Sequence, residues 1–308
     1  MRLKCFLLLI AVSIVHAQYN RPGSADGQFL RIGVSPRATA MGDAYIAVAN
    51  GAEAAFYNQA ALAKIPGIDI VFNHNFWFAG INHDFLAACF NLKKLGTFAF
   101  SLNALYTDQM QVTTPLRPDG TGETFYAYNY KVSISYSRFF TDRVTFGASI
   151  GYVFSSLYKN FTASAVAFDF AAMYTSDFRN FRFAMQISNF GSELKFVNES
   201  YPLPTSFNFG AAMNIIEKNN YNLLVSIMGI KPNTGQPLLF SGLEWSYNDN
   251  FFVRAGYKFN HGTADYSFGG GLKLNIDKYN LKFDYSYSHY KFLGSAHMIG
   301  IGISIITK

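Results

Sequence analysis

Apolar and polar residues alternate with a period of two along most of the chain from residue 67 onward. In segment 97–105, Phe98 and Phe100 share one face, while Ser101 and Asn103 share the other. Because successive side chains of a strand point to opposite faces, this alternation predicts strands that separate an apolar from a polar environment. The segments are about 9–13 residues long, the length that a tilted strand needs to cross a bilayer.

Fourteen such segments can be counted, and single-chain bacterial outer-membrane barrels have an even number of strands. The expected strands are 67–78, 82–91, 95–107, 128–139, 143–155, 164–175, 180–190, 204–216, 220–230, 237–247, 250–259, 265–276, 279–289 and 295–306. We therefore predict an all-β fold, a transmembrane antiparallel β-barrel of about fourteen strands, over residues 67–308.

The links between the expected strands alternate between short and long after the first hairpin. The short turns are rich in Asn, Asp and Lys, and the longer links are 108–127, 156–163, 191–203, 231–236, 260–264 and 290–294. Outer-membrane barrels have short periplasmic turns and longer external loops. The pattern therefore places both termini in the periplasm.

Several charged residues fall in the register of the polar face. They are Asp169, Arg182, Glu244, Arg254, Lys258, Lys273, Lys282 and Asp284. An Arg or Lys that faces lipid at mid-depth costs roughly 2–4 kcal/mol, whereas one that faces a wet or plugged lumen does not. We expect these side chains to face the lumen, where they solvate and cross-link it.

Residues 1–17 have the pattern of a secretory signal peptide. Arg2 and Lys4 precede an apolar run from Cys5 to Val15, which is too short to span a bilayer as a helix. Small or tolerated residues end the segment at Ala17, so we expect the mature chain to begin at the next residue. After the signal, no apolar stretch approaches the length of a transmembrane helix.

Residues 18–66 differ from the rest of the chain, because they are rich in Ala and lack long alternation. Ala favours helix, and Gly42, Gly51 and Pro66 interrupt the helix-favouring stretches. We predict a small N-terminal helical plug segment that folds back into the barrel or lies under its periplasmic mouth. Arg37 should pair there with a carbonyl or an acidic group such as Asp43 or Glu53, because an unpaired buried charge is costly.

This segment resembles the opening signature of the PorV/PorQ family of outer-membrane proteins, and FadL-type fatty acid transporters have a looser version. The matching residues are Arg37, Ala38, Met41, Gly42, Asp43, Ala44, Ala47, Val48, Ala49, Asn58, Ala60, Leu62 and Ala63. The chain departs at Gln59, where the family usually has Pro. The resemblance implies a barrel, fourteen-stranded in FadL-like proteins, and a role like that of PorV, which receives exported proteins in type IX secretion and shuttles them to the surface.

The composition narrows the range of protein classes and partners that fit this chain. Charged residues make up only 14% of the chain, against roughly 25% in soluble domains. The net charge of +6 includes two residues of the signal, and no block of Lys or Arg exists, so we expect no nucleic acid partner. Cys89 is the only cysteine after the signal, which excludes a disulfide within the mature chain.

Chemical motifs are absent from the sequence. It has no phosphate-binding loop, no HExxH and no GxSxG, and its histidines are scattered. We treat the neighbours His83 and Asp84 as a chance pair. We predict no catalytic residues, no cofactor and no metal site, and therefore no enzyme.

Three functions remain open for a barrel in the outer membrane of a Gram-negative-type bacterium. The leading hypothesis is a secretion-associated barrel whose partners are secretion-system proteins or exported cargo. The alternative is a FadL-like channel for hydrophobic small molecules, and the third is a structural porin-like barrel. In each case outer-membrane lipid surrounds the protein.

Different features should separate these functions. A transporter should have an apolar pocket beside the plug and a lateral gap in the wall, whereas a protein-binding barrel should expose apolar surface on its outer loops. An open porin needs no plug. We expect loop 108–127, which combines Pro and Gly with Met110, Val112, Leu116 and Phe125, to fold over the barrel mouth and bind the partner.

Overall fold

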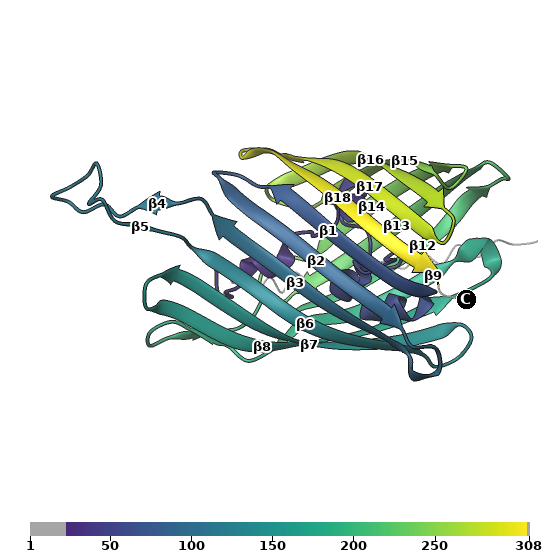
Figure 1. The fold of residues 1–308 in the computed structure, drawn as a ribbon, viewed down its shortest axis with the longest axis horizontal. Coiled ribbons are helices and arrows are strands. Elements are labelled where there is room, and N and C mark those ends of the chain that lie inside the picture. Colours follow the sequence, from purple (N-terminus) through teal and green to yellow (C-terminus); the bar gives the residue numbers. More distant parts are fainter. Residues whose placement is uncertain (1–22, 307–308) are drawn as a thin grey trace, which may run out of the picture.

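The computed structural model describes residues 23–306, which form a closed β-barrel. The predicted signal peptide, 1–17, and the first residues of the predicted plug lie outside the described residues. Each wall strand is antiparallel to its two neighbours, and β1 closes the barrel against β18 (Figure 1).

The wall has fourteen strands, as the alternation predicts. They are β1 (Gly67–Phe76), β2 (Ile81–Asn91), β3 (Thr97–Thr107), β6 (Tyr128–Phe139), β7 (Val144–Tyr158), β8 (Phe161–Thr175), β9 (Arg182–Gly191), β12 (Ser206–Glu217), β13 (Tyr221–Pro232), β14 (Leu238–Tyr247), β15 (Phe251–Phe259), β16 (Ala264–Ile276), β17 (Tyr279–Tyr290) and β18 (Gly294–Ile306). The predicted all-β transmembrane fold is therefore confirmed.

Two ends of the barrel can be told apart by their links. The short-turn end has the links 92–96, 140–143, 176–181, 218–220, 248–250 and 277–278, two of which contain the 3-10 helices η3 (Lys93–Leu95) and η4 (Phe178–Asn180). The long-loop end has two small hairpins outside the wall, β4 (Met110–Gln111) with β5 (Thr124–Phe125) and β10 (Leu194–Lys195) with β11 (Ser200–Tyr201). The first strand begins and the last strand ends at the short-turn end (Figure 1).

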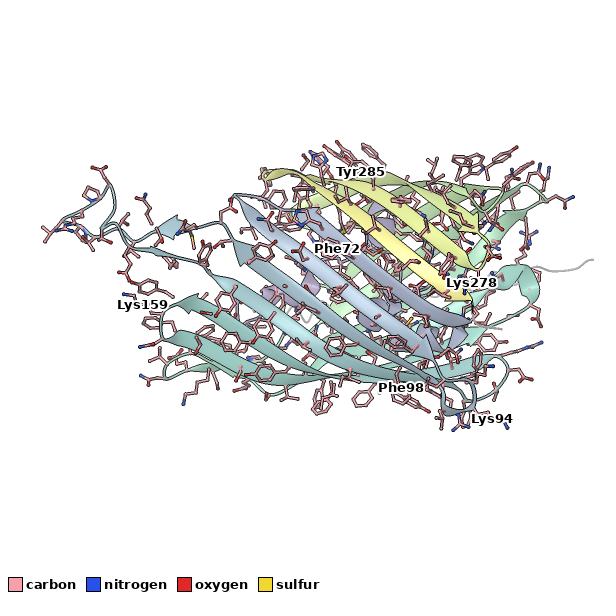
Figure 2. All side chains as sticks on the ribbon, viewed as in Figure 1. Phe72, Lys94, Phe98, Lys159, Lys278 and Tyr285 are labelled. Carbon is pink, nitrogen blue, oxygen red and sulfur yellow. The ribbon has the colours of Figure 1, made fainter. Side chains whose placement is uncertain are left out.

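The outer face of the wall is apolar. Phe72, Phe98 and Tyr285 point away from the barrel, while Lys94 and Lys278 lie at its short-turn end (Figure 2). An apolar exterior bounded by polar ends matches a bilayer and its two interfaces. The chain therefore has the fold and the surface of a Gram-negative outer-membrane barrel.

Two expectations about the links are wrong. The expected link 156–163 is a turn of two residues, because β7 runs to Tyr158 and β8 starts at Phe161. Lys159 makes this tight turn with a positive φ of 44°. Loop 108–127 does not fold over the mouth but projects beyond the barrel as the β4–β5 hairpin (Figure 1).

The described part of the N-terminal segment, residues 23–66, lies inside the barrel, and we call it the plug (Figure 1). It contains four short helices, η1 (Gln28–Arg31), α1 (Pro36–Ala40), α2 (Ala54–Tyr57) and η2 (Gln59–Lys64). Tyr45, Ile46 and Leu62 of the plug share one buried apolar cluster with Phe85 and Phe240 of the wall.

Between residues 23 and 306, no helix is long and apolar enough to cross a membrane.

The backbone of the plug lies very close to the backbone of the wall at Gly42. Gly42 has a positive φ of 63°, and a Cβ there would lie 2.7 Å from the backbone nitrogen of Tyr257. On the facing strand, a Cβ at Gly256 would lie 2.0 Å from the backbone nitrogen of Gly42. Both residues therefore need to be glycine, Gly42 for its conformation as well as for the space.

Candidate functional site: the plug and the lumen cavity

The residues at the start of α1 fix this short helix, which is the first turn of the plug that contacts the wall. Ser35 is the N-cap of α1, and its hydroxyl accepts a hydrogen bond from the backbone nitrogen of Ala38 at 3.3 Å. Pro36 occupies the first helical position, where its fixed φ and missing N–H are tolerated. This short helix presents Arg37 toward β14 and ends at the buried Met41.

A second capped turn begins at Asn58. Its side-chain oxygen accepts from the backbone nitrogen of Ala60 at 3.1 Å, and its amide nitrogen donates to the carbonyl oxygen of Ile46 at 2.8 Å. Gln59 is the first residue of η2, a position that suits the Pro usual in the related family. Gln59 additionally accepts a hydrogen bond from Gln186 of the wall at 3.1 Å.

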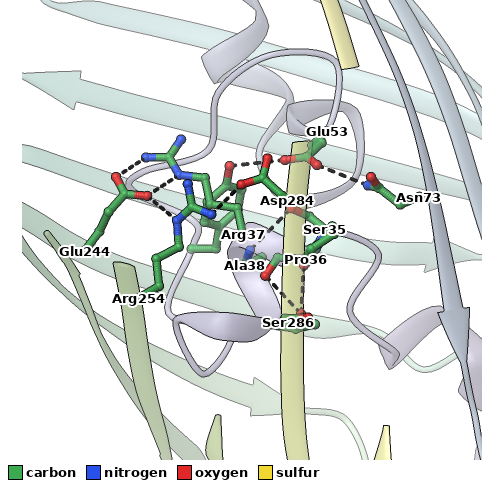
Figure 3. A network of polar contacts seen from close by, with 12 residues as sticks. Ser35, Pro36, Arg37, Ala38, Glu53, Asn73, Glu244, Arg254, Asp284 and Ser286 are labelled. Atoms are coloured by element: carbon green, nitrogen blue, oxygen red, sulfur yellow. Dashed lines mark hydrogen bonds and ion pairs between the residues drawn. The ribbon is translucent and has the colours of Figure 1, made fainter. Parts of the chain in front are cut away.

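A chain of four charged residues joins the plug to three wall strands (Figure 3). Arg37 donates two hydrogen bonds of 2.7 Å to the carboxylate of Glu244. Arg254 donates to the same carboxylate at 2.6 Å and to Asp284 at 2.5 Å. Two-point Arg–carboxylate bonds are among the stronger polar contacts in proteins, so this chain fixes where the plug sits.

The expected partners of Arg37 are therefore wrong, because Asp43 and Glu53 are engaged elsewhere. Asp43 forms an ion pair with Lys258 of β15. Glu53 accepts a hydrogen bond from Asn73 at 3.1 Å (Figure 3). It also accepts one from the hydroxyl of Tyr45 at 3.3 Å. Burial and the neighbouring Asp284 raise the pKa of Glu53 above its usual range.

The other charged residues that were predicted to face the lumen lie at different positions along the barrel. Asp169 is buried in the long-loop half, where Lys131 lies 2.9 Å from its carboxylate and Ser149 donates to it at 2.5 Å. Arg182 begins β9 at the short-turn end. Burial, and to a smaller extent the charge of Arg182, lowers the pKa of the plug residue Lys64 to about 8. Lys273 lines a cavity at the short-turn end.

A hollow lies between the plug and the long-loop half of the wall, and we call it the lumen cavity. Its volume is about 360 Å³. Phe56 and Tyr57 of the plug line it, together with Phe85, Met228 and Phe240 of the wall. Hydroxyl and amide side chains such as Ser101, Asn103 and Gln186 also line it. Its charged lining residues are Arg31, Asp43, Lys131, Asp169 and Lys258.

An apolar cluster lies beside this cavity, toward the long-loop end. Phe29 and Leu30 of η1 pack there against Val153 of the wall and against Leu194 and Leu203 of the loop between β9 and β12. The first helix of the plug is therefore buried under the loop between β9 and β12 at the long-loop end of the barrel.

A smaller hollow of about 240 Å³ lies on the other side of the plug. Arg37, Glu53, Asp69, Lys282 and Asp284 are part of its charged lining. The plug thus separates a cavity near the long-loop end, which combines apolar, polar and charged side chains, from a more highly charged cavity near the short-turn end.

The ladder between strands β8, β9 and β12 is irregular next to the lumen cavity. A β-bulge places Asp169 opposite Ser188 and Asn189, and Asn189 has a positive φ of 54°. Pairing of β9 with β12 stops at Ser188, three residues before β9 ends at Gly191. The wall is held by fewer main-chain bonds at this point.

The side chains of His83 and Asp84 make no contact with each other in the structure, in agreement with the chance pairing expected from the sequence. His83 faces inward and bonds to Asn103 at 2.6 Å. Asp84 faces outward and bonds to His74 at 2.6 Å and to Tyr106 at 2.8 Å. Within residues 23–306, no group of three or more His, Cys, Asp or Glu side chains gathers in the manner of a metal site.

Sequence reasoning missed most of the cavity lining. Phe56, Phe85 and Met228 are ordinary apolar residues in the sequence, and only the folded barrel brings them together. Lys131 was also missed, although it lies next to an inward-facing Asn129 and Ser133 in an alternating strand. The strict alternation of apolar and polar residues in that strand could have identified Lys131 as an inward-facing residue.

Comparison with solved structures identifies the same fold. The Ralstonia pickettii toluene transporter TbuX is 14% identical, with a TM-score of 0.57 over 89% of this chain and 99% of that chain. The Pseudomonas putida toluene transporter TodX is 14% identical, with a TM-score of 0.57 over 88% and 97%. A Pseudomonas aeruginosa FadL homologue is 10% identical, with a TM-score of 0.53 over 89% and 98%.

No family model and no curated protein matches the sequence. The FadL-like barrel fold implied by the N-terminal signature is therefore confirmed, while the PorV/PorQ assignment stays a prediction.

Proposed function

We propose that the chain is an outer-membrane channel for small hydrophobic molecules, which was the alternative hypothesis from the sequence. The observation that carries the proposal is the lumen cavity, a hollow closed on one side by the plug, in which Phe56, Phe85 and Phe240 lie beside polar and charged side chains. Pockets of this size and lining suit small ligands. Among structures with this fold, TbuX and TodX are described as toluene transporters, and CymD is described as a monoaromatic hydrocarbon channel.

The arrangement supports entry from the long-loop end, which we assign to the outside of the cell. An apolar molecule would pass the cluster around Phe29 and Leu30 and then reach Phe56 and Phe240 in the cavity. The plug blocks a straight water-filled path, which argues against an open porin. Onward movement then needs a shift of the plug or an exit through the irregular wall near Asn189.

Uptake of labelled toluene by Gram-negative cells that express the chain tests the proposal. Met228 lines the lumen cavity, whereas the adjacent Ile227 faces outward. We expect the natural chain to accelerate uptake over cells without it. Met228→Trp, which fills the cavity, should return uptake to that background, while Ile227→Trp should leave it high. No acceleration by the natural chain would refute the channel.

A secretion-associated role is the second candidate, because two observations favour it. The first is the PorV/PorQ-like signature from Arg37 to Ala63. The second is the β4–β5 hairpin, which stands clear of the barrel with Leu116 94% exposed. An apolar side chain so far from the wall suits contact with another protein.

A further inference from the structure

The turns at the short-turn end of the barrel fall into two unlike halves. Three hairpins that follow one another in the wall, β2–β3, β6–β7 and β8–β9, form one half. Their turn regions, which we call the basic arc, are residues 92–96, 138–143 and 176–181. The basic arc contains five Lys or Arg and only two Asp, whereas the turns 218–220, 248–250 and 277–278 of the other half contain two Lys, two Asp and otherwise only Asn. The excess positive charge of the turns therefore lies in the basic arc.

Large apolar side chains stand at the tips of the basic arc. Leu95 is 67% exposed, Phe140 is 75% exposed and Phe178 is 68% exposed. Phe140 packs edge-on against the outward-facing Phe146 of β7, with 5.6 Å between the ring centroids. The hydroxyl of Tyr136, which also faces outward, donates to the carbonyl oxygen of Leu95 at 2.9 Å. The tips therefore continue the lipid-facing surface of the wall beyond the strands.

Two cations of the basic arc have no partner in the protein. Arg138 follows Tyr136 on the outward face of β6, and Lys94 lies in the neighbouring turn at the short-turn end (Figure 2). Within residues 23–306, neither side chain forms an ion pair or a hydrogen bond. The nearby acid Asp177 does not neutralise them, because Arg143 engages it at 2.6 Å.

Cations at the edge of an apolar belt lie at the level of lipid headgroups. Outer-membrane barrels have their short turns on the periplasmic side, so the basic arc meets the periplasmic leaflet. Lys and Arg at such a boundary keep their apolar stems along the lipid and their charged ends in the polar layer. Arg can bind two phosphate oxygens at once, and Lys adds a second positive charge. Apolar tips beside unpaired cations therefore fit a lipid with a negatively charged headgroup.

We propose that the basic arc is a binding site for an anionic phospholipid of the periplasmic leaflet, such as phosphatidylglycerol. Arg138 and Lys94 bind the phosphate, while Leu95 and Phe140 contact the acyl chains next to the headgroup. The site lies on the outside of the wall, so it is independent of what the lumen carries.

Native mass spectrometry of the purified full-length barrel in detergent tests the proposal. The barrel is mixed with equal amounts of phosphatidylglycerol and phosphatidylethanolamine that have the same acyl chains. The two lipids then differ only in the headgroup, and only phosphatidylglycerol has a net negative charge. We expect at least about fivefold more phosphatidylglycerol to stay bound, because each basic residue near a membrane surface favours anionic lipid.

Two double variants make the test specific. Lys94→Gln with Arg138→Gln removes the two unpaired cations, so the two lipids should then bind about equally. Lys218→Gln with Lys278→Gln is the matched control, because both residues are exposed in the turns of the other half. The control removes the same charge from the same end of the barrel and should keep the preference. Retention of the normal heat-dependent shift in electrophoretic mobility shows that each variant is folded.

Several results would overturn the proposal. Equal binding of the two lipids by the natural chain would do so, and an acidic periplasmic protein would then be the partner that fits the same charges. Equal loss of the preference in both double variants would show that net charge, and not the basic arc, is the cause. Glycerol phosphate, which has the phosphate but no acyl chains, should not displace the lipid at equal concentration. If it does, the cations bind any phosphate and the arc is not a lipid site.

Discussion

At the scale of single residues, paired charges connect the plug to the wall. Alternation along the strands places Glu244 and Arg254 on the inward face, but it says nothing about their partners. Arg37 and Glu244 are 207 residues apart, and their contact depends on how the plug is folded. This is why the sequence predicted a buried pair for Arg37 and named the wrong acids.

Replacing Arg37 by Ala should loosen the plug. Breaking a buried ion pair from one side costs about 3–5 kcal/mol, and we expect the lower end because Glu244 keeps Arg254 as a partner. The measurement is protease cleavage within the plug of the folded barrel, which should become faster. The control is Arg31→Ala, because Arg31 hydrogen-bonds to the neutral side chains of Asn233 and Thr234 and forms no ion pair within residues 23–306. Equal protease sensitivity of the two variants would contradict the fastening role.

Glu53 should make stability depend on pH. Because burial and Asp284 raise its pKa above the unfolded value, the folded state favours the protonated carboxyl. That stabilisation is present below about pH 4.3, the unfolded pKa, and is lost as the pH rises through the raised pKa. Glu53→Gln, which stays neutral and can still accept from Asn73, should therefore unfold at a higher temperature than the natural chain at pH 8.

The same variant should gain almost nothing at pH 3, where the natural carboxyl is nearly all protonated in both the folded and the unfolded state. Thermal unfolding in detergent at the two pH values measures this difference. A gain of the same size at both pH values would show that the carboxyl charge is not the cause.

At the scale of elements, alternation predicted each wall strand because one face meets lipid and the other meets the lumen. It failed between β7 and β8, where Thr162 and Ser164 are exposed on the outward register. Polar residues near the end of a strand lie beyond the apolar belt, so their sequence resembles that of a loop. The short helices of the plug follow from Ala and capping residues, but their arrangement depends on contacts with many strands.

The lumen cavity shows the limit of sequence reasoning most clearly. Its lining combines plug residues such as Phe56 with wall residues such as Ser101 and Phe240. No local pattern connects these positions, because closure of the barrel alone brings the first and last thirds of the chain together.

Deleting residues 112–123 should separate the two candidate functions at the level of one element. The β4–β5 hairpin stands outside the wall, so the barrel should assemble and toluene uptake should stay normal (Figure 1). Display of exported protein at the cell surface should be lost if the hairpin holds a protein partner. Loss of uptake with intact assembly would instead place the hairpin on the small-molecule route.

At the scale of the whole molecule, the barrel and the plug depend on each other in different ways. The wall is closed by continuous antiparallel pairing and can hold its shape through main-chain bonds. The plug has only short helices and is held by buried contacts with the wall. A change that blocks docking should therefore release the plug without opening the wall.

Gly256→Val makes this prediction specific. A Cβ at Gly256 meets plug backbone at 2.0 Å, and backbone cannot move aside as a flexible side chain can. Valine suits a strand, so we expect the barrel to assemble with its plug displaced. The pore should then conduct ions in planar bilayers, where the natural chain conducts little, and cells should admit a large polar antibiotic.

Gly270→Val is the matched control. Gly270 lies on the next strand, and the nearest atom to a Cβ there is the carbonyl oxygen of Phe252, at an ordinary 3.5 Å. This variant adds the same side chain to the same wall without touching the plug, so its conductance should equal that of the natural chain. If both variants conduct equally, the added valine damages the wall itself and the plug is not what keeps the pore closed. If neither conducts, the plug tolerates the intrusion, and close packing at Gly42 is not what holds it in the lumen.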